Sequence, residues 1–344
     1  MLTILDHLPD GLLDCHASEL TGLLPGPTLV HLPGQREEPL FVSVLLHGNE
    51  TTGLTAVQGL LRKYVERPLP RALSIFFGNL AAAATGKRHL PEQPDYNRVW
   101  PCADGAGDTA EHHMMRRVVD EMRARKVFAS IDIHNNTGLN PHYGCVNRLE
   151  PRFLHLARLF SRTVVYFIRP TGVQSLAFAA LCPAVTVECG KPEHPFGADH
   201  ARDFVDSCLH LEALADTPPA AHDIDLFHTE ATVTLRAEAS AGFAAPGETG
   251  PWEATFPADL DRLNFRELPA GSAIARVLKD ADRLPLMVCD EQGRDVTAHY
   301  LHVADGELQL KRTVMPSMFT LNLEIIRQDC VGYLMERLPL AAEP

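Results

Sequence analysis

The sequence predicts an α/β fold, with a mixed, mostly parallel sheet flanked by helices and a smaller C-terminal β domain. Short apolar runs alternate with helix-like segments up to about residue 215. This alternation is typical of a parallel sheet covered on both faces. Beyond the Pro-containing stretch 217–223, strand-like runs and turns dominate. With 344 residues, 45% of them hydrophobic, the chain can form one large core and a second, smaller one.

The first part of the chain contains five predicted buried strands, which cover 40–46, 74–79, 128–134, 164–168 and 184–189. Three helices are expected between and after them, over 51–65, 109–125 and 198–215. In the first helix, apolar residues recur at helical spacing from Leu54 to Tyr64. Thr51 or Thr52 is placed to cap its N-terminus.

The C-terminal part of the chain is predicted to form a separate β domain. Strand-like runs cover 231–239, 272–278, 284–290 and 307–314. Turn signals such as PAG, EQGRD and ADGE separate them. We therefore expect a catalytic domain over 1–216 and a β-rich domain over 224–344.

The composition limits the classes of partner. A formal net charge of −13 argues against nucleic acid and anionic membrane surfaces, and no 18-residue apolar segment is present to span a membrane. The N-terminus lacks a basic region and carries early acidic residues, so we expect no signal peptide. Cys182 and Cys189 lie in apolar runs and no CxxC occurs, which is typical of free thiols in a cytoplasmic protein. A homo-oligomer is compatible with all of this.

Two predicted strand ends carry side chains that can bind a metal ion. The apolar run 41–46 ends in His47 with Glu50 close behind, and the run 128–133 ends in His134. Active sites of open α/β sheets lie at the carboxyl ends of strands, so these side chains are expected to converge. Zinc accepts imidazole and carboxylate ligands, and catalytic zinc sites use three of them. A structural zinc site fits less well, because such sites usually close with four ligands, often cysteines.

Two further segments extend this pattern. DYNR (95–98) lies in a proline-flanked loop, and ECG (188–190) ends an apolar strand whose carboxylate needs a polar partner if it is buried. Together with HGNE (47–50) and DIHNNTG (132–138), they stand in the order found in the succinylglutamate desuccinylase/aspartoacylase family. The chain resembles this family by motif over roughly residues 40–200. The resemblance implies a zinc carboxypeptidase-like fold and one zinc ion per chain, held by the three residues at the strand ends.

The resemblance also implies roles for residues around the metal. Glu188 matches the general base that activates the attacking water, and Asn97 and Arg98 match the pair that binds the substrate carboxylate. Arg88 lies near the family's Arg that polarises the scissile carbonyl. The sequence departs from the family in one respect, because no Arg is found in SLAFAALCPA, which precedes Glu188; the nearest is Arg169.

Other polar residues near the motifs can support the site. Asp132 lies two residues before His134, so both side chains are expected on the same face of the sheet, where the carboxylate can orient the ligand. Residues that can bond ligands or substrate, or line the pocket, are Asn135, Asn136, Thr137, His142, Tyr143 and His194.

These observations predict a zinc-dependent hydrolase that cleaves the amide bond of an N-acyl amino acid or a similar small carboxylate. Metal-activated water would be the nucleophile and Glu188 the general base. The alternative enzyme is a metallocarboxypeptidase acting on short peptides or cell-wall fragments. A rival from another class is a binding or regulatory module that keeps the metal without turnover. Activity on N-acyl amino acids and on short peptides separates the three.

Overall fold

The computed structural model describes residues 1–340 except 103–104, 106, 246–247, 249 and 279–282. The chain divides into two compact units. The first comprises Met1–Asn135 and His142–Asp225, and the second comprises Asn136–Pro141 and Leu226–Leu340. We propose that these units are the two domains expected from the sequence, with the short segment 136–141 assigned to the second.

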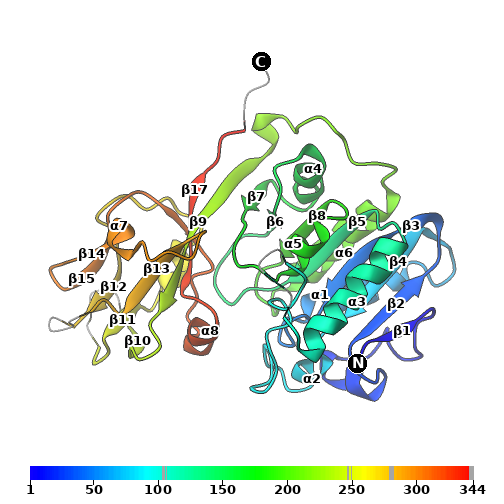
Figure 1. Cartoon of the computed structure of the whole chain (residues 1–344), viewed down its shortest axis with the longest axis horizontal. Helices are drawn as coiled ribbons and strands as arrows, with labels where there is room; N and C mark the ends of the chain where they lie inside the picture. Colours follow the sequence, from blue (N-terminus) through cyan, green and yellow to red (C-terminus); the bar gives the residue numbers. More distant parts are fainter. Residues whose placement is uncertain (103–104, 106, 246–247, 249, 279–282, 341–344) are drawn as a thin grey trace. The chain divides into compact units, whose positions relative to one another are not determined.

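The first unit contains eight strands of a mixed sheet (Figure 1). Their spatial order is β1 (Thr3–Leu5), β2 (Thr28–Leu32), β4 (Leu69–Phe77), β3 (Gly34–Val44), β5 (Ala129–His134), β8 (Ala184–Glu188), β6 (Tyr143–Val146) and β7 (Thr163–Tyr166). The central strands β4, β3, β5 and β8 are parallel neighbours. Antiparallel pairing occurs between β2 and β4 and between β8 and β6. The predicted mixed, mostly parallel α/β sheet is confirmed.

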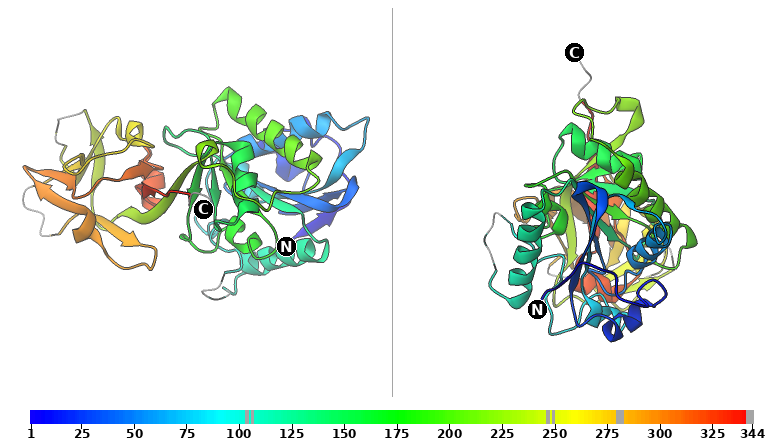
Figure 2. Two further views of the ribbon diagram at one scale, coloured as in Figure 1. Left: turned by 90° about the horizontal axis from the view of Figure 1, so that it is seen from above. Right: turned by 90° about the vertical axis from the view of Figure 1, so that its right-hand side faces the viewer.

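Helices cover both faces of this sheet. They are α1 (Thr52–Arg62), α2 (Leu80–Ala83), α3 (Ala110–Ala124), α4 (Pro151–Phe160), α5 (Gln174–Phe178) and α6 (Pro195–His210), with 3₁₀ turns at Ala17–Gly22 and Ala221–Asp223. In the right-hand view of Figure 2, α3 lies on one side of the sheet and α1 and α6 lie on the other. The three helices predicted from periodicity are confirmed as α1, α3 and α6, with small differences at their ends. Thr51 occupies the N-cap position of α1.

The sequence analysis did not predict several short elements. The strands β1, β2 and β6 have three to five residues, and runs this short carry little periodic signal. The helix α4 was recognisable, because it has proline in its first turn and buries Phe153, Leu156 and Phe160 on one face.

The second unit is rich in β-structure. Antiparallel neighbours join β13 (Leu286–Asp290), β9 (Asp225–Leu235), β17 (Gly332–Arg337) and β16 (Met315–Ser317). A five-stranded sheet has the order β10 (Ala241–Ala244), β11 (Ala254–Pro257), β12 (Ala273–Val277), β15 (Glu307–Leu310) and β14 (Leu301–Ala304). Its helices are η3 (Leu260–Leu263), α7 (Thr297–Tyr300) and α8 (Leu323–Gln328). The four predicted strands of this part overlap β9, β12, β13 and β15 and are confirmed.

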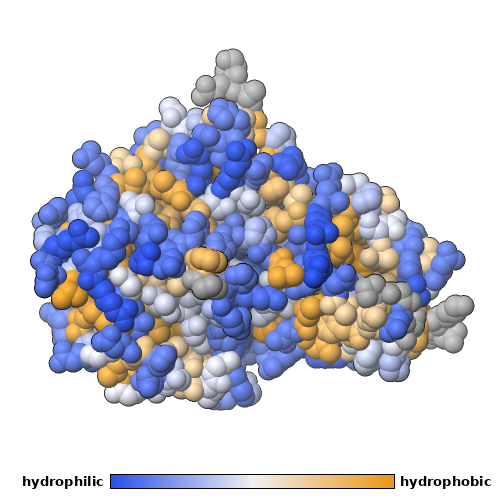
Figure 3. Space-filling view, turned by 180° about the vertical axis from the view of Figure 1, so that it is seen from behind, coloured by the Kyte–Doolittle hydropathy of each residue, from blue (hydrophilic) through white to orange (hydrophobic). Residues whose placement is uncertain are grey.

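Among the described residues, none of the helices combines the length and apolar character needed to cross a membrane. On the face seen in Figure 3, hydrophilic side chains are interspersed with smaller hydrophobic groups. All eight cysteines are free, and Cys182 and Cys189 are buried as expected.

A buried histidine makes the stability of the first unit sensitive to acid. On β2, His31 is buried and its Nδ1 lies 2.8 Å from Ser74 Oγ, while its Nε2 has no hydrogen-bond partner in the described part of the chain. Burial, with a smaller contribution from the charge of Arg125, lowers the pKa of His31 from 6.5 to about 4. Below pH 6.5 the unfolded chain therefore binds a proton that the folded chain does not, and stability falls until the pH reaches the folded-state pKa.

The variant His31→Asn places a polar atom near the position of Nδ1. We expect its free energy of unfolding to rise relative to that of the wild type as the pH falls. At about 1.4 kcal/mol per pKa unit, the difference in unfolding free energy should move by about 2 kcal/mol in its favour between pH 7.5 and 5. Urea titrations at both values measure this. His222→Asn is the control, because its side chain is 86% exposed. An equal pH response of His31→Asn and the wild type would contradict the assignment.

Candidate active site

The first metal-binding segment follows β3 in a sharp turn. Leu45 has a φ of 57°, a left-handed conformation that is uncommon outside glycine. Gly48 then packs on α2 so closely that a Cβ added there would lie 2.2 Å from the backbone nitrogen of Ala83. The turn brings His47 and Glu50 together at the carboxyl end of β3, directly before α1.

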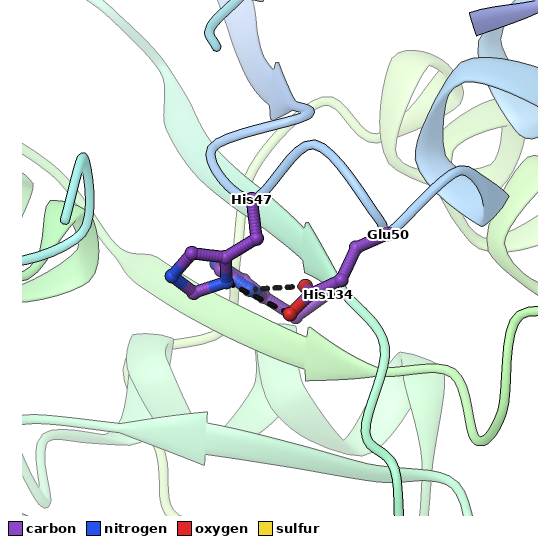
Figure 4. Close-up of side chains that lie close together, drawn as sticks. All are labelled: His47, Glu50 and His134. Atoms are coloured by element: carbon purple, nitrogen blue, oxygen red, sulfur yellow. Dashed lines mark hydrogen bonds and ion pairs between the residues drawn. The ribbon is translucent and has the colours of Figure 1, made fainter. Parts of the chain in front are cut away.

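The three predicted metal ligands converge in the structure. His47 Nδ1 lies 2.8 Å from Glu50 Oε1, and His134 Nδ1 lies 2.7 Å from Glu50 Oε2 (Figure 4). All three residues are buried, and one ligand atom from each lies within 4.8 Å of the others. Among the described residues, no other group of three His, Cys, Asp or Glu side chains lies close enough together to hold a metal ion.

The second nitrogen of each imidazole is bound to a carboxylate. His47 Nε2 lies 2.9 Å from Asp95 Oδ1, and His134 Nε2 lies 2.7 Å from Asp132 Oδ2. Metal-binding histidines usually donate their other N–H to a carboxylate or carbonyl, which selects the tautomer and the ring orientation. Two Nδ1 atoms and a carboxylate, with both Nε2 atoms already bound, therefore fit a zinc ion in the donor set that catalytic sites use.

The charges around these ligands oppose the effect of burial. Burial disfavours the charged form of His134, but the carboxylates of Asp132 and Glu50 outweigh it and raise the pKa of this imidazole well above its ordinary value. Burial also raises the pKa of Glu50, yet His47 and His134 hold it far below the usual range. Because metal ligands must be deprotonated, binding an ion here has to displace protons from the imidazoles.

Asp95 binds two cationic partners with its two oxygens. Oδ1 faces His47, while Oδ2 accepts from Arg88 Nε at 3.2 Å and from Arg88 Nη2 at 2.9 Å. Burial would raise the pKa of Asp95, but His47 and Arg88 hold it well below its ordinary value. The third nitrogen of the Arg88 side chain, Nη1, lies 3.8 Å from Glu50 Oε1. Arg88 therefore lies beside the three predicted metal ligands, and its role at the scissile carbonyl stays a prediction.

The loop that carries Asn97 and Arg98 lies beside the metal ligands. Asn97 Nδ2 donates to Asp132 Oδ2 at 3.4 Å, and Asn97 Oδ1 accepts from the backbone N–H of Gln174 at 2.9 Å. The segment before α5 packs on this loop, since Gly172 O accepts from the backbone N–H of Trp100 at 2.9 Å.

Glu188 lies next to the metal ligands in the register of the sheet. It ends β8, where it is paired with His134 of β5 on one side and with Tyr143 of β6 on the other. Directly opposed residues on adjacent strands share a face of the sheet. Both Glu188 and Tyr143 are buried. The fold thus places the predicted general base opposite a predicted metal ligand in the register of the sheet.

Asp132 is held at a second point behind the ligands. Its Oδ1 accepts from Ser43 Oγ at 2.7 Å, and its Oδ2 faces His134. The expectation that Asp132 contacts His134 is confirmed. Ser43 is paired with Asp132 in the register of β3 and β5, so the parallel pairing of these strands sets the position of the carboxylate.

The sequence analysis missed the contact of Asp95 with His47. The signal was present, because Asp95 opens the DYNR segment, but only Asn97 and Arg98 were assigned roles there. His142 was expected to line the pocket, and the structure places its ring against Phe160 and His200, 5.1 Å from the latter. Phe160 belongs to α4 and His200 to α6, and neither is part of the group around Glu50.

Removing the carboxylate of Asp95 should weaken metal binding. We expect Asp95→Asn to lower zinc affinity by roughly 10- to 100-fold, the range found when the outer partners of metal ligands are removed. The reason is that Asn accepts more weakly from His47 and loses the charge that Arg88 pairs with. Competition with a chelator measures the effect. Asp120→Asn, on the exposed face of α3, is the control. Unchanged affinity in Asp95→Asn would show that this contact does not orient the ligand.

Comparison with known proteins agrees with this geometry. A family model described as "Succinylglutamate desuccinylase/Aspartoacylase catalytic domain" matches residues 38–215. The chain belongs to this family. The matched range contains all the motifs on which the resemblance was based. The chain is also similar to the succinylglutamate desuccinylase of Serratia proteamaculans (strain 568). The two are 24% identical over 293 residues, which cover 78% of this chain and 79% of the relative.

Solved structures of family members share the fold. The succinylglutamate desuccinylase from Chromobacterium violaceum has a TM-score of 0.56 at 17% identity, over 89% of this chain and 87% of that one. Murine aminoacylase 3 has a TM-score of 0.54 at 17% identity, over 89% of this chain and 97% of that one. At this level of identity the likeness establishes the architecture of the family and leaves the substrate open.

Proposed function

We propose that this family member is a zinc-dependent hydrolase that cleaves the amide bond of an N-acyl amino acid or a similar small carboxylate. The observation that supports it most directly is the arrangement of His47, Glu50 and His134. Two Nδ1 atoms and a carboxylate meet, both Nε2 atoms are bound to carboxylates, and Glu188 is the register neighbour of His134. His47, Glu50 and His134 would hold the zinc ion, which would supply Lewis acidity and a hydroxide nucleophile near neutral pH.

Glu188 is proposed as the group that moves the proton. It accepts a proton from the attacking water while the new carbon–oxygen bond forms. It then donates that proton to the leaving nitrogen as the carbon–nitrogen bond breaks. A positioned general acid–base group of this kind typically contributes about 10²- to 10⁴-fold to the rate.

Two arginines are proposed to stabilise negative charge on the substrate, one at its carboxylate and one at the scissile carbonyl oxygen. Arg98, in the loop with Asn97, binds the carboxylate of the substrate, because guanidinium groups form paired, charge-assisted hydrogen bonds to carboxylates. Arg88 is held by Asp95 with its Nη1 near Glu50, where it can stabilise the charge that develops on the scissile carbonyl oxygen. Asn97 is proposed to bind the substrate carboxylate together with Arg98. Within the protein, its Oδ1 accepts from the backbone N–H of Gln174, and its Nδ2 lies 3.4 Å from Asp132 Oδ2 and 3.1 Å from His134 Nε2.

The function is tested by metal analysis followed by an activity panel. Protein purified without chelators should contain about one zinc ion per chain and should hydrolyse at least one member of a set of N-acetyl and N-succinyl amino acids. Hydrolysis of short peptides in place of these compounds would favour a metallocarboxypeptidase. Zinc bound without hydrolysis of either set would favour a binding module. A chain that takes up no zinc, even when the metal is supplied, would contradict the proposal.

A further inference from the structure

The segment that follows the ligand His134 is held by residues far away in the sequence. Residues 136–141 belong to the second unit, although His134 and Asn135 belong to the first. We propose that Asn264 and Thr320 are positioning residues for His134, because they hold the segment into which this ligand's strand continues. This inference rests on the proposed metal site and assigns the C-terminal unit a part in maintaining it.

The first contact of this segment is between two hydroxyl groups. Thr137 Oγ1 donates to Thr320 Oγ1 at 2.7 Å, and Thr320 is buried. Thr137 was expected to bond ligands or substrate, and the structure gives it this partner in the second unit. Three residues further on, Asn140 Oδ1 accepts from the backbone N–H of Met318 at 3.0 Å. Two residues of the segment, Thr137 and Asn140, are therefore bound to the stretch 318–320.

Asn264 holds the same stretch at Phe319. Its Nδ2 donates to the carbonyl of Phe319 at 2.8 Å, and its Oδ1 accepts from the backbone N–H of Phe319 at 2.8 Å. Both residues are buried, so these bonds are shielded from water. A side chain that satisfies both backbone groups of one residue keeps that residue in one conformation.

Gly138 allows the segment to approach Phe319 closely. A Cβ added at Gly138 would lie 1.9 Å from the carbonyl oxygen of Phe319 and 3.1 Å from Asn264 Nδ2. Any other residue would have to push the segment away. This explains a glycine in the DIHNNTG motif that the metal site by itself does not require.

The start of the segment is tied just as closely to the metal-binding group. The backbone N–H of Asn135 donates to Glu50 Oε2 at 3.0 Å, and Asn135 Nδ2 donates to the carbonyl of Gly190, two residues after Glu188, at 2.8 Å. Successive residues after His134 are thus hydrogen-bonded first to Glu50 and then, from Thr137 onward, to residues of the second unit. A shift of the segment is passed to the ligand through two peptide units.

The variants Thr320→Val and Asn264→Ala test the proposal with metal affinity as the readout. We expect each to lower zinc affinity about tenfold, the lower end of the range for outer partners, and to lower kcat while leaving KM little changed. The absorption spectrum of the cobalt-substituted protein should also change, because it reports ligand geometry. Tyr300→Phe is the control. It removes a buried hydroxyl that donates to Glu230 at 3.1 Å elsewhere in the second unit, and it should leave affinity and spectrum unchanged.

The outcomes separate this inference from the proposed function. Wild-type protein that binds no zinc would overturn the metal site itself. Wild type that binds zinc and hydrolyses substrate, with Thr320→Val and Asn264→Ala lowering only the unfolding midpoint, would overturn the positioning role alone. If Asn264→Ala does not fold, Thr320→Val decides, because it replaces one hydroxyl by a methyl group and removes only the bonds of that hydroxyl to Thr137 Oγ1 and to the backbone N–H of Asn322.

Discussion

Replacing His134 by Ala is expected to abolish metal binding and hydrolysis together. Two ligands remain, and the loss of zinc affinity should exceed the 10- to 100-fold typical of outer partners. The change also removes the imidazole that lies between two buried carboxylates, Glu50 and Asp132. Leaving a buried charge without its partner destabilises proteins by roughly 3–5 kcal/mol, so the metal-free variant should unfold at a lower urea concentration than metal-free wild type.

Metal content, activity and urea unfolding of the metal-free forms measure these three effects. His134→Asn keeps a polar group at the position and separates the loss of a ligand from the loss of packing. His113→Ala is the matched control, because His113 is an exposed histidine on α3. Full zinc content in His134→Ala would contradict the three-ligand site and with it the proposed chemistry.

Replacing Glu188 by Gln is expected to separate metal binding from turnover. Gln has the size of Glu but cannot accept the proton from the attacking water at neutral pH. Hydrolysis should therefore fall by roughly 10²- to 10⁴-fold. Zinc content should stay near one per chain, because Glu188 is a register neighbour of His134 and is not a member of the metal-binding group.

Steady-state kinetics and metal analysis of the same preparation measure both quantities. Glu66→Gln, at an exposed position after α1, is the control for the loss of one carboxylate. A Glu188→Gln variant that turns over at the wild-type rate would show that another group moves the proton. Loss of zinc in this variant would instead place Glu188 among the ligands.

The predictions that held depend on short stretches of sequence. The strands that became β3, β5 and β8 are recognisable as apolar runs of five to seven residues, and parallel strands of one sheet end at the same edge. His47, His134 and Glu188 follow or end these strands, so their convergence was predictable without knowing any side-chain contact. The helix α1 was equally clear, because its buried residues recur at helical spacing.

The contacts that were missed join residues remote in sequence. Asp95 lies 48 residues from His47, and nothing in the DYNR segment shows which of its side chains faces the imidazole. Thr137 lies 183 residues from Thr320, so the segment after His134 could not be assigned to the second unit. The hydrogen bond between Trp100 and Gly172 also joins segments remote in sequence.

The sequence by itself determined the class of fold and the family, and it predicted the three residues that the structure brings together into a group that could hold a metal ion. It did so because strand ends, helical periodicity and motif order are local properties of the chain. Only the tertiary structure decided which carboxylate orients each imidazole, how Arg88 is held at Glu50, and which unit holds the segment after His134. Those choices depend on distances between segments that meet only after folding, where buried polar groups must find partners, and many combinations of partners agree with the same local pattern.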